Sequence, residues 1–314
     1  MKIITIVGAR PNFLKLDPEL KQTIIHTGQH YNKNMSDVFL RGFKVKFNLK
    51  CKKVGQMIDK LRPILAKEKP NMVLVFGDTN SSLAGALAAS YEKIPVAHIE
   101  AGLRSYTDMP EEINRVIIDR ISNLKFCPDN NSLLNLIKEG LEGNSFIVGD
   151  PLIDTLSKYL PIKKTKGGYI LITIHRESNS NEIFIKDFFK ILENTNENYV
   201  FPVHPRIKKI VKKVPKNIRI IEPQEYKKML ELESNAKKII TDSGGVQREG
   251  SWMNVPVILM RNETEWTDLV KKGSVKLSNL ENLKNDIENF KGVISSPPLF
   301  GVNKKIREII FKYI

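Results

Sequence analysis

Cysteine is scarce in this sequence, and long apolar runs are missing. Cys51 and Cys127 are the only cysteines among 314 residues, and they form no CxxC pair. A disulfide framework is therefore not expected, and the chain is predicted to work in a reducing compartment, the cytoplasm. No apolar run approaches the roughly 18 to 20 residues that a membrane-spanning helix needs, and the apolar segment after Met1 is too short for a secretory signal. We expect a soluble protein without a membrane partner.

Short motifs for metals and dinucleotides are missing as well. The chain contains no Asp-x-Asp pair, no P-loop and no GxGxxG fingerprint. The first absence argues against a diphosphate held through a divalent metal, and the last argues against a nicotinamide cofactor. We therefore predict an activity that needs neither a metal nor a cofactor.

Charge is plentiful but unbalanced. The 50 Lys and Arg residues exceed the 35 Asp and Glu residues, which gives a formal net charge of +15. Such an excess raises the question of nucleic acid. However, no aromatic residues are interleaved with the lysine clusters at 163–166, 208–209 and 212–213 to form a base-stacking surface, and no zinc-finger spacing occurs. The basic surface favours an anionic small molecule as the partner. We do not expect a nucleic-acid partner.

Short apolar runs rich in β-branched residues alternate with helical stretches along the chain. Buried runs that alternate with helices indicate βαβ units and parallel sheets. The first series of expected strands comprises Ile3–Val7, Thr23–Thr27, Met72–Phe76, Val96–Ile99, Leu124–Cys127 and Ser145–Val148. The second comprises Tyr169–Thr173, Tyr199–Pro202, Ile218–Ile221, Lys238–Thr241 and Val257–Met260. A polar stretch marked by Pro and Gly separates the two series.

Two Rossmann-like, doubly wound α/β domains that face each other across a cleft are the simplest architecture for this pattern. We place the first domain at residues 1–152 and the second at 153–301. Residues 302–314 are expected to form a closing helix that packs back on the first domain. Ligands of such sheets bind at the carboxyl ends of the strands, so the residues that follow each strand are the candidates for a functional site.

Charged residues follow three strands of the first series. Arg10 and Lys15 lie after the first strand, where a helix N-terminus already favours phosphate. Asp78 follows the third strand and is either a functional carboxylate or the N-cap of the next helix. Glu100 ends the fourth strand, and a carboxylate in an apolar setting is costly unless it is paired or functional.

The helix that begins at Pro110 carries a further charged pair. Its predicted core face repeats at helical spacing and consists of Ile113, Ile117, Ile121 and Leu124. Glu111 and Arg115, four residues apart, are then neighbours on nearly the opposite side. In isolation such a pair is usually a solvated ion pair. Its place beside the carboxyl end of the fourth strand favours a pair that faces the ligand.

The strands of the second series end in the same way. His175 and Arg176 follow the strand at 169–173, and His204 follows the next strand. Ser243-Gly244-Gly245 opens a helix after the strand at 238–241, where exposed backbone N–H groups suit an oxyanion. Glu249, about a turn and a half into that helix, is placed to accept two sugar hydroxyls.

Together these segments resemble one family over essentially the whole chain, the non-hydrolysing UDP-N-acetylglucosamine 2-epimerases, whose two-domain fold is shared with many nucleotide-sugar glycosyltransferases. The matching segments are GARPNFLK, HTGQHYNKNMSDVF, VFGDTNSSLAGALAA, VAHIEAGLRS, MPEEINR, VGDPLIDTL, TIHRESN, PVHPR, PQEY, TDSGGVQREG and RNETEW. The resemblance implies that the catalytic carboxylates are Asp78, Glu100 and Glu111. It implies that Arg115 and His175 hold the diphosphate and assist the departure of UDP. It also implies that the nucleotide is bound by Arg10, Ser243, Gly244 and Glu249.

The activity that this resemblance implies is an isomerisation. UDP-N-acetylglucosamine and UDP-N-acetylmannosamine would interconvert by elimination of UDP to 2-acetamidoglucal and readdition, in a homodimer that serves cell-surface polysaccharide biosynthesis. Two alternatives stay open. Trp266 of RNETEW resembles a branch that includes epimerases of UDP-2,3-diacetamido sugars such as the glucuronate, and a metal-free glycosyltransferase of the same fold would also bind UDP. One departure is Asn12, which stands where the family usually has Glu or Gln.

Overall fold

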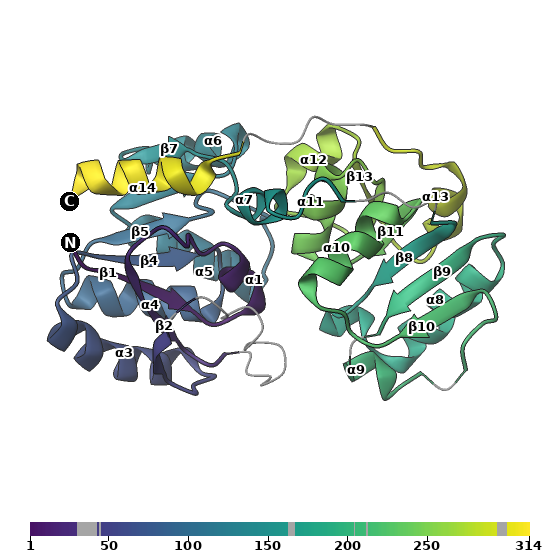
Figure 1. The fold of residues 1–314 in the computed structure, drawn as a ribbon, viewed down its shortest axis with the longest axis horizontal. Helices are drawn as coiled ribbons and strands as arrows, with labels where there is room; N and C mark the ends of the chain where they lie inside the picture. Colours follow the sequence, from purple (N-terminus) through teal and green to yellow (C-terminus); the bar gives the residue numbers. More distant parts are fainter. Residues whose placement is uncertain (30–42, 44, 163–166, 204, 212, 294–299) are drawn as a thin grey trace. The chain divides into compact units, whose positions relative to one another are not determined.

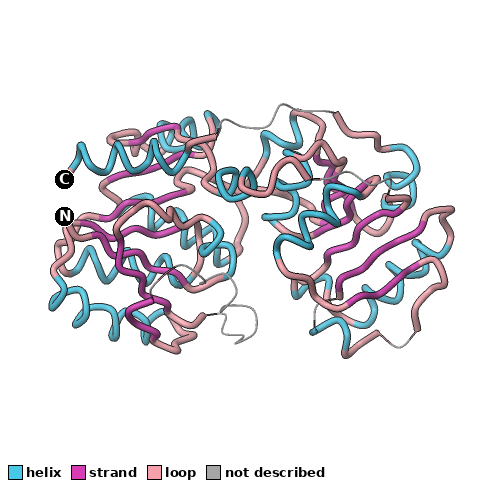
Figure 2. The backbone as a smooth tube through the Cα atoms, in the orientation of Figure 1, coloured by secondary structure: helices cyan, strands magenta, loops and turns pink. Residues whose placement is uncertain are grey.

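The structure is a computed structural model that describes residues 1–29, 43, 45–162, 167–203, 205–211, 213–293 and 300–314. The chain divides into two units. The first consists of Met1–Lys158 and Leu299–Ile314, and the second of Tyr159–Pro298. Each unit contains one parallel sheet with helices packed on it, as the ribbon in Figure 1 and the tube in Figure 2 show.

The first unit is built on a seven-stranded sheet of order β3-β2-β1-β4-β5-β6-β7, whose strand order reverses between β1 and β4. Its strands are β1 Ile3–Val7, β2 Gln22–His26, β3 Val45–Asn48, β4 Met72–Phe76, β5 Val96–Ile99, β6 Leu124–Cys127 and β7 Ser145–Ile147. Its described helices are α1 Arg10–Leu14, α3 Val54–Glu68, α4 Asn80–Tyr91, α5 Pro110–Ile121, α6 Asn130–Lys138, α7 Leu152–Ser157 and α14 Val302–Tyr313. Ligand sites of such sheets lie where the strand order reverses.

The second unit repeats the plan with a six-stranded sheet of order β10-β9-β8-β11-β12-β13, which reverses between β8 and β11. Its strands are β8 Tyr169–Thr173, β9 Asn198–Pro202, β10 Ile218–Ile221, β11 Lys238–Thr241, β12 Val257–Met260 and β13 Val275–Ser278. Its described helices are η1 Glu177–Asn179, α8 Glu182–Glu193, α9 Pro205–Lys208, α10 Tyr226–Asn235, α11 Gly244–Trp252, α12 Thr267–Lys271 and α13 Leu283–Asn289.

The strands are apolar because helices cover them. All five residues of β1 and of β4 are buried, as expected for central strands of a parallel sheet. Helix α3 buries a stripe with a spacing of four residues, Met57, Leu61 and Leu65, in the core of the first unit. In the second unit, Phe189 of α8 and Phe201 of β9 pack edge to face with ring centroids 6.4 Å apart.

The predicted fold class, two doubly wound parallel α/β sheets, is confirmed. Strands β3 and β13 were not predicted. Both lie at a sheet edge, where one side of the strand has no partner to cover it. Half-buried and exposed positions alternate in β3, and the two central residues of β13 are half-buried. Neither segment is therefore a continuous apolar run.

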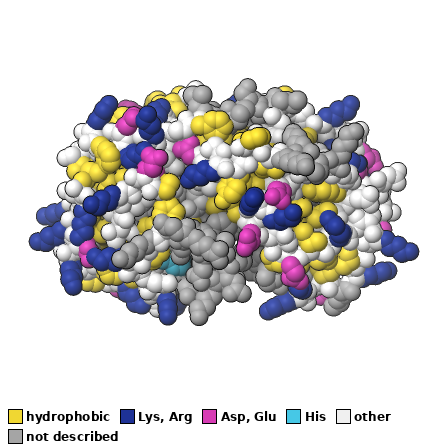
Figure 3. All heavy atoms as spheres, in the orientation of Figure 1, with side chains coloured by type: hydrophobic (Ala, Val, Ile, Leu, Met, Phe, Trp, Pro, Cys, Tyr) yellow, Lys and Arg dark blue, Asp and Glu magenta, His cyan; other side chains and the backbone are white. Residues whose placement is uncertain are grey.

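The first unit extends to Lys158 and so includes α7, whereas the sequence placed the boundary at residue 152. The closing helix α14 also belongs to this unit. Asp154 of α7 accepts the backbone N–H groups of Gly301 and Asn303, each at 2.7 Å, at the start of α14. None of the helices in the described ranges is long and apolar enough to cross a membrane. Figure 3 shows Lys and Arg side chains scattered over the face in view, among apolar ones.

Candidate active site

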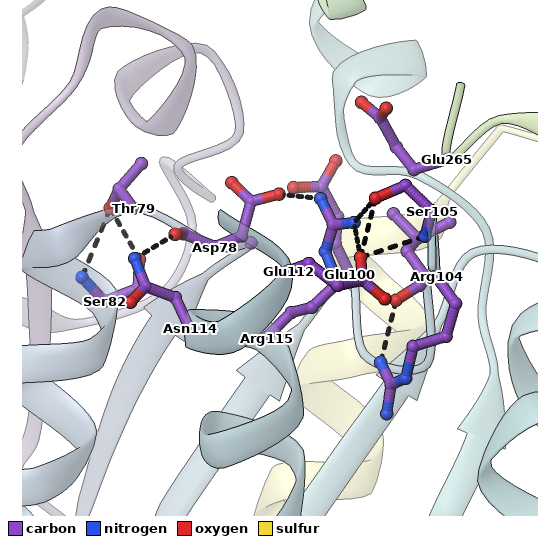
Figure 4. A network of polar contacts seen from close by, with 12 residues as sticks. Asp78, Thr79, Ser82, Glu100, Arg104, Ser105, Glu112, Asn114, Arg115 and Glu265 are labelled. Atoms are coloured by element: carbon purple, nitrogen blue, oxygen red, sulfur yellow. Dashed lines mark hydrogen bonds and ion pairs between the residues drawn. The ribbon is translucent and has the colours of Figure 1, made fainter. Parts of the chain in front are cut away.

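Two carboxylates and an arginine gather at the carboxyl ends of β4 and β5 (Figure 4). Asp78 follows β4 after one glycine, and Glu100 directly follows β5. These strands are parallel neighbours, so their carboxyl ends lie at one edge of the sheet. Arg115 reaches this edge from α5 and forms an ion pair with Asp78. The structure therefore brings together three of the predicted site residues.

Asp78 is not the N-cap of α4. That position belongs to Thr79, whose hydroxyl accepts the backbone N–H of Ser82 at 3.2 Å. The capping alternative for Asp78 is wrong, and its carboxylate, 29% exposed, pairs with Arg115 instead.

Arg115 lies between two carboxylates. Its side chain is 3% exposed, and besides Asp78 it contacts a Glu112 carboxylate oxygen at 2.5 Å. Glu112 in turn accepts the backbone N–H and the hydroxyl of Ser105 at 2.9 and 2.8 Å. Burial alone would raise the pKa of Glu112, but the bonds from Ser105 and the charge of Arg115 lower it. The ionised Glu112 thus fixes the guanidinium beside Asp78.

Helix α5 is turned differently from the prediction. Ile113, expected in the core face, is 56% exposed. The buried positions of the helix are Glu112, Asn114, Arg115, Ile118 and Asp119. Polar residues occupy this face because they find partners there; Asn114, for example, donates to the Asp78 carbonyl at 2.8 Å. The partner of Arg115 on the helix is accordingly Glu112, and the predicted partner, Glu111, is exposed.

Glu100 is buried and paired with Lys15. The Lys15 Nζ atom lies 2.5 Å from the Glu100 Oε2 atom, and the two side chains are 4% and 6% exposed. The backbone of Glu100 has a φ of +72°, a conformation that costs about 1–3 kcal/mol in a residue with a side chain. At Gly77 an added Cβ would lie 2.8 Å from Glu100 Oε2, so glycine makes room for the carboxylate. A strained, paired carboxylate at the ligand edge of a sheet indicates function.

The glycine turn before α1 is tied to β4 through Asn12. The backbone N–H groups of Gly8 and Ala9 donate to the Asn12 side-chain oxygen at 3.3 and 3.1 Å. The Asn12 amide donates to the Phe76 carbonyl at 3.4 Å. Arg10 is the first residue of α1, but its side chain lies outside the described part of the chain.

In the second unit, Asp242 holds the turn that presents His175 and Arg176. Its fully buried carboxylate accepts the backbone N–H groups of His175 and Arg176 at 3.1 and 2.9 Å, and it lies 3.0 Å from His175 Nδ1. Burial would raise the pKa of Asp242, but these hydrogen bonds and the His175 ring lower it. The His175 side chain is 45% exposed. His204, the other predicted histidine, lies outside the described residues.

The predicted Ser-Gly-Gly turn opens α11. Ser243 is the N-cap, with its hydroxyl 3.4 Å from the Val246 nitrogen, and Gly244 and Gly245 begin the helix. Glu249, on the same helix, is 4% exposed and accepts a hydrogen bond from the Tyr226 hydroxyl at 2.6 Å. Burial and the Glu249 charge raise the pKa of Tyr226, so the phenol keeps the proton that it donates.

Sequence reasoning missed three residues of this constellation, namely Glu112, Asp242 and Tyr226. Each lies in a segment that carries the family resemblance: Glu112 in PEEINR, Asp242 in TDSGGVQREG, and Tyr226 at the end of PQEY. Their partners, such as Glu249 for Tyr226, come from other elements, so spacing along the chain carried no signal. Within the described ranges no cluster of His, Cys, Asp and Glu side chains is arranged to hold a metal ion.

Comparison with known proteins identifies the family of the chain. Residues 12–297 match the sequence family described as UDP-N-acetylglucosamine 2-epimerase. The chain belongs to this family. A UDP-N-acetylglucosamine 2-epimerase homolog of Methanococcus maripaludis is 42% identical, over 92% of each chain. The UDP-2,3-diacetamido-2,3-dideoxy-D-glucuronate 2-epimerase of Pseudomonas aeruginosa is 37% identical, over 87% of each chain.

A solved structure of the UDP-N-acetylglucosamine 2-epimerase family shares the fold along the whole chain. It is the UDP-GlcNAc 2-epimerase of Methanocaldococcus jannaschii in complex with UDP-GlcNAc and UDP, with a TM-score of 0.89, 36% sequence identity, and coverage of 99% of this chain and 100% of that one. The family assigns the chain to the epimerases, a class of isomerase.

Proposed function

We propose that this epimerase interconverts UDP-N-acetylglucosamine and UDP-N-acetylmannosamine, and that the reaction runs by elimination and readdition of UDP. The observation that carries the proposal is the set of carboxylates and cations at the ends of β4 and β5, in a chain of this family. The complex of the Methanocaldococcus jannaschii relative with UDP-GlcNAc and UDP supports the choice of substrate.

The chemistry needs these residue types. The C2 proton of the sugar has no neighbouring carbonyl to acidify it, so it becomes removable only as the C1–O bond to UDP breaks. That bond's electron pair leaves with UDP, a carboxylate takes the proton, and a C1–C2 double bond forms. Readdition reverses these steps with a proton returned to the other face of C2. A base, an acid and cations at the departing diphosphate are therefore required.

We assign the proton transfers to Asp78, Glu100 and Glu111. Glu100 lies against the Lys15 ammonium and Asp78 against the Arg115 guanidinium, and these cations favour the carboxylate form of both side chains. Glu111 is exposed at the start of α5, where it can meet a substrate. Lys15 pairs with Glu100, so we assign it to holding that carboxylate. We assign the diphosphate to Arg115 and His175, as the resemblance of the PEEINR and TIHRESN segments implies.

We assign UDP binding to the second unit. The N-terminal turn of α11, with Ser243, Gly244 and Gly245, suits the diphosphate because its backbone N–H groups point out of the helix. The Glu249 carboxylate suits the ribose hydroxyls. Arg10, Arg176 and His204 complete the proposed contacts with the anionic ligand. No nucleic acid is proposed as a partner.

The proposal is tested by incubating the protein with UDP-N-acetylglucosamine alone and following the anomeric proton signals by NMR. Appearance of UDP-N-acetylmannosamine, with the same equilibrium reached from either sugar, is the expected result. Release of UDP that requires a sugar acceptor, without inversion at C2, would contradict it and indicate a glycosyltransferase.

A second substrate is favoured by one observation. The Pseudomonas aeruginosa relative, 37% identical, is an epimerase of UDP-2,3-diacetamido-2,3-dideoxy-D-glucuronate. Comparing kcat/KM for this sugar and for UDP-N-acetylglucosamine decides between them, because that ratio measures discrimination in the transition state. We expect the larger value with UDP-N-acetylglucosamine; a large preference for the diacetamido sugar would reverse the assignment.

We also infer a homodimer in the cytoplasm. Apolar side chains that α5 and the preceding loop leave exposed support self-association: Tyr106, Ile113 and Val116 are 72%, 56% and 39% exposed. The two free, buried cysteines support a reducing compartment. Sedimentation equilibrium should give a dimer that Ile113→Asp weakens, whereas Ile183→Asp, at an exposed position of α8 in the second unit, leaves it intact. A monomeric wild-type chain would contradict the inference.

A further inference from the structure

A buried group of alternating charges lies next to the two loops that carry Asp78 and Glu100. It consists of His98 on β5, Asp119 on α5, Arg104 on the loop between them and Glu139 after α6. His98 and Asp119 are fully buried, and the Arg104 side chain is 1% exposed. None of these residues has a part in the proposed chemistry, and buried charges are costly unless they serve a purpose.

His98 connects Asp119 to the loop of Asp78. Its Nδ1 atom lies 2.6 Å from Asp119 Oδ1, and its Nε2 atom lies 2.9 Å from the carbonyl oxygen of Gly77. Both ring nitrogens thus lie within hydrogen-bond distance of an oxygen, one on Asp119 and one on the backbone. The second contact holds Gly77, the residue directly before Asp78.

Asp119 connects the same histidine to the loop of Glu100. Its Oδ2 atom accepts the backbone N–H of Gly102 at 3.0 Å and a guanidinium N–H of Arg104 at 2.7 Å. Arg104 is anchored by two further bonds of 2.7 Å to Glu139. Burial would raise the pKa of Asp119, but the charges and hydrogen bonds of His98 and Arg104 lower it. Asp119 thus holds His98 and Gly102, the residues two before and two after Glu100. We call His98 and Asp119, with their contacts to the two loops, the clamp.

Both loops turn sharply, and at Glu100 the backbone adopts a strained conformation. Glu100, Gly77 and Gly102 all have positive φ, at +72°, +59° and +79°. Gly77 donates its N–H to the Ile99 carbonyl at 2.8 Å, and a Cβ there would lie 2.8 Å from Glu100 Oε2. A shift of the Gly77 carbonyl by a fraction of an ångström would therefore move Asp78 and alter the room left for the Glu100 carboxylate.

We propose that His98 and Asp119 are positioning residues, which set the separation of Asp78 and Glu100 because this one buried pair of side chains holds the backbone of both loops. The inference rests on the proposed function, in which these two carboxylates carry protons. Proton transfer is sensitive to such placement, since a displacement of about 1 Å can lower a rate about a hundredfold. The pair acts through the two loops and touches no reacting atom.

Substitutions that preserve the shape of the side chain separate the two contacts of His98, one with Asp119 and one with the Gly77 carbonyl. In His98→Gln the amide nitrogen can still reach the Gly77 carbonyl, whereas in His98→Asn the shorter amide reaches Asp119 only. In Asp119→Asn one oxygen is replaced by a donor, which faces either Gly102 or His98. The control is Ile118→Ala, on the same helix, which removes a fully buried side chain of the core but no part of the clamp.

The experiment measures kcat and KM for UDP-N-acetylglucosamine, the Kd of UDP and Tm for all five proteins. The assays are made at a temperature where circular dichroism shows every variant folded. We expect Asp119→Asn and His98→Asn to lower kcat about 10- to 100-fold with KM and the UDP Kd within about twofold. His98→Gln should keep a larger kcat than His98→Asn. Ile118→Ala should lower Tm with kcat within about twofold.

Two results would reject the proposal that His98 and Asp119 are positioning residues. If kcat follows Tm, so that Ile118→Ala loses as much turnover as the clamp variants, the pair is only structural. If His98→Asn turns over as fast as His98→Gln, the link to Gly77 has no part in catalysis. Both results leave the proposed function intact, because the wild type still epimerises its substrate. Absence of turnover in the wild type would overturn the proposed function and this inference with it.

Discussion

Asp78 and Glu100, at the ends of β4 and β5, show which parts of the candidate site can be predicted from a sequence. Asp78 and Glu100 could be predicted because each follows a recognisable buried strand. The choice between Glu111 and Glu112 as the partner of Arg115 could not be predicted from the pattern. Successive helix residues point about 100° apart, and here the buried one is Glu112, because Ser105 and Arg115 satisfy its carboxylate.

Substitutions at these residues should separate chemistry from binding. We expect Glu100→Gln and Glu111→Gln to lower kcat by at least about a hundredfold, the usual scale for loss of a general acid or base. The Kd of UDP should change little, since Ser243 and Glu249 are assigned to the nucleotide. Ser243→Ala and Glu249→Ala should instead weaken UDP binding, as measured by calorimetry. Wild-type turnover in Glu100→Gln would make Glu100 a structural residue.

The absence of an Asp-x-Asp pair leads to a prediction about the metal requirement. In the proposed site the departing diphosphate is received by Arg115, His175 and the start of α11, so no divalent metal is needed. Full activity is expected after dialysis against excess EDTA. Activity that vanishes with the chelator and returns with Mg²⁺ or Mn²⁺ would show that the assignment of these cations is wrong.

Among the elements, α5 departs furthest from expectation. Its apolar periodicity predicted a core face through Ile113, yet that residue is 56% exposed, while Arg115 and Asp119 are buried. The periodicity of apolar residues cannot identify the buried face of a helix when that face consists of polar residues that have hydrogen-bond and ion-pair partners. Strands β3 and β13 were missed for a related reason, because neither is a continuous buried apolar run.

Helix α5 also carries a prediction about acid stability. The folded state lowers the pKa of Asp119, so its carboxylate stabilises the fold above the unfolded pKa of about 3.9. That contribution is lost as the pH falls through the folded value. The difference in unfolding free energy between the wild type and Asp119→Asn should therefore narrow below about pH 4 in urea titrations. A difference that is the same at pH 7 and pH 3.5 would contradict the ionised assignment of Asp119.

For the molecule as a whole, the two units carry different parts of the proposed reaction. The first holds the carboxylates and Arg115, and the second holds His175 and the α11 turn. The two-sheet fold and most central strands could be predicted because buried parallel strands have a strong local pattern. The contacts that orient the site, such as Asp242 with His175 and Tyr226 with Glu249, join distant segments and required the structure.

The most direct test of the account is the fate of the C2 proton in D₂O. If a carboxylate removes this proton while UDP departs, exchange with solvent precedes its return. The product UDP-N-acetylmannosamine should then carry deuterium at C2, and prolonged incubation should label the recovered UDP-N-acetylglucosamine as well. Epimerisation with C2 protium fully retained, measured by NMR and mass spectrometry, would contradict the roles of Asp78, Glu100 and Glu111 as proton carriers.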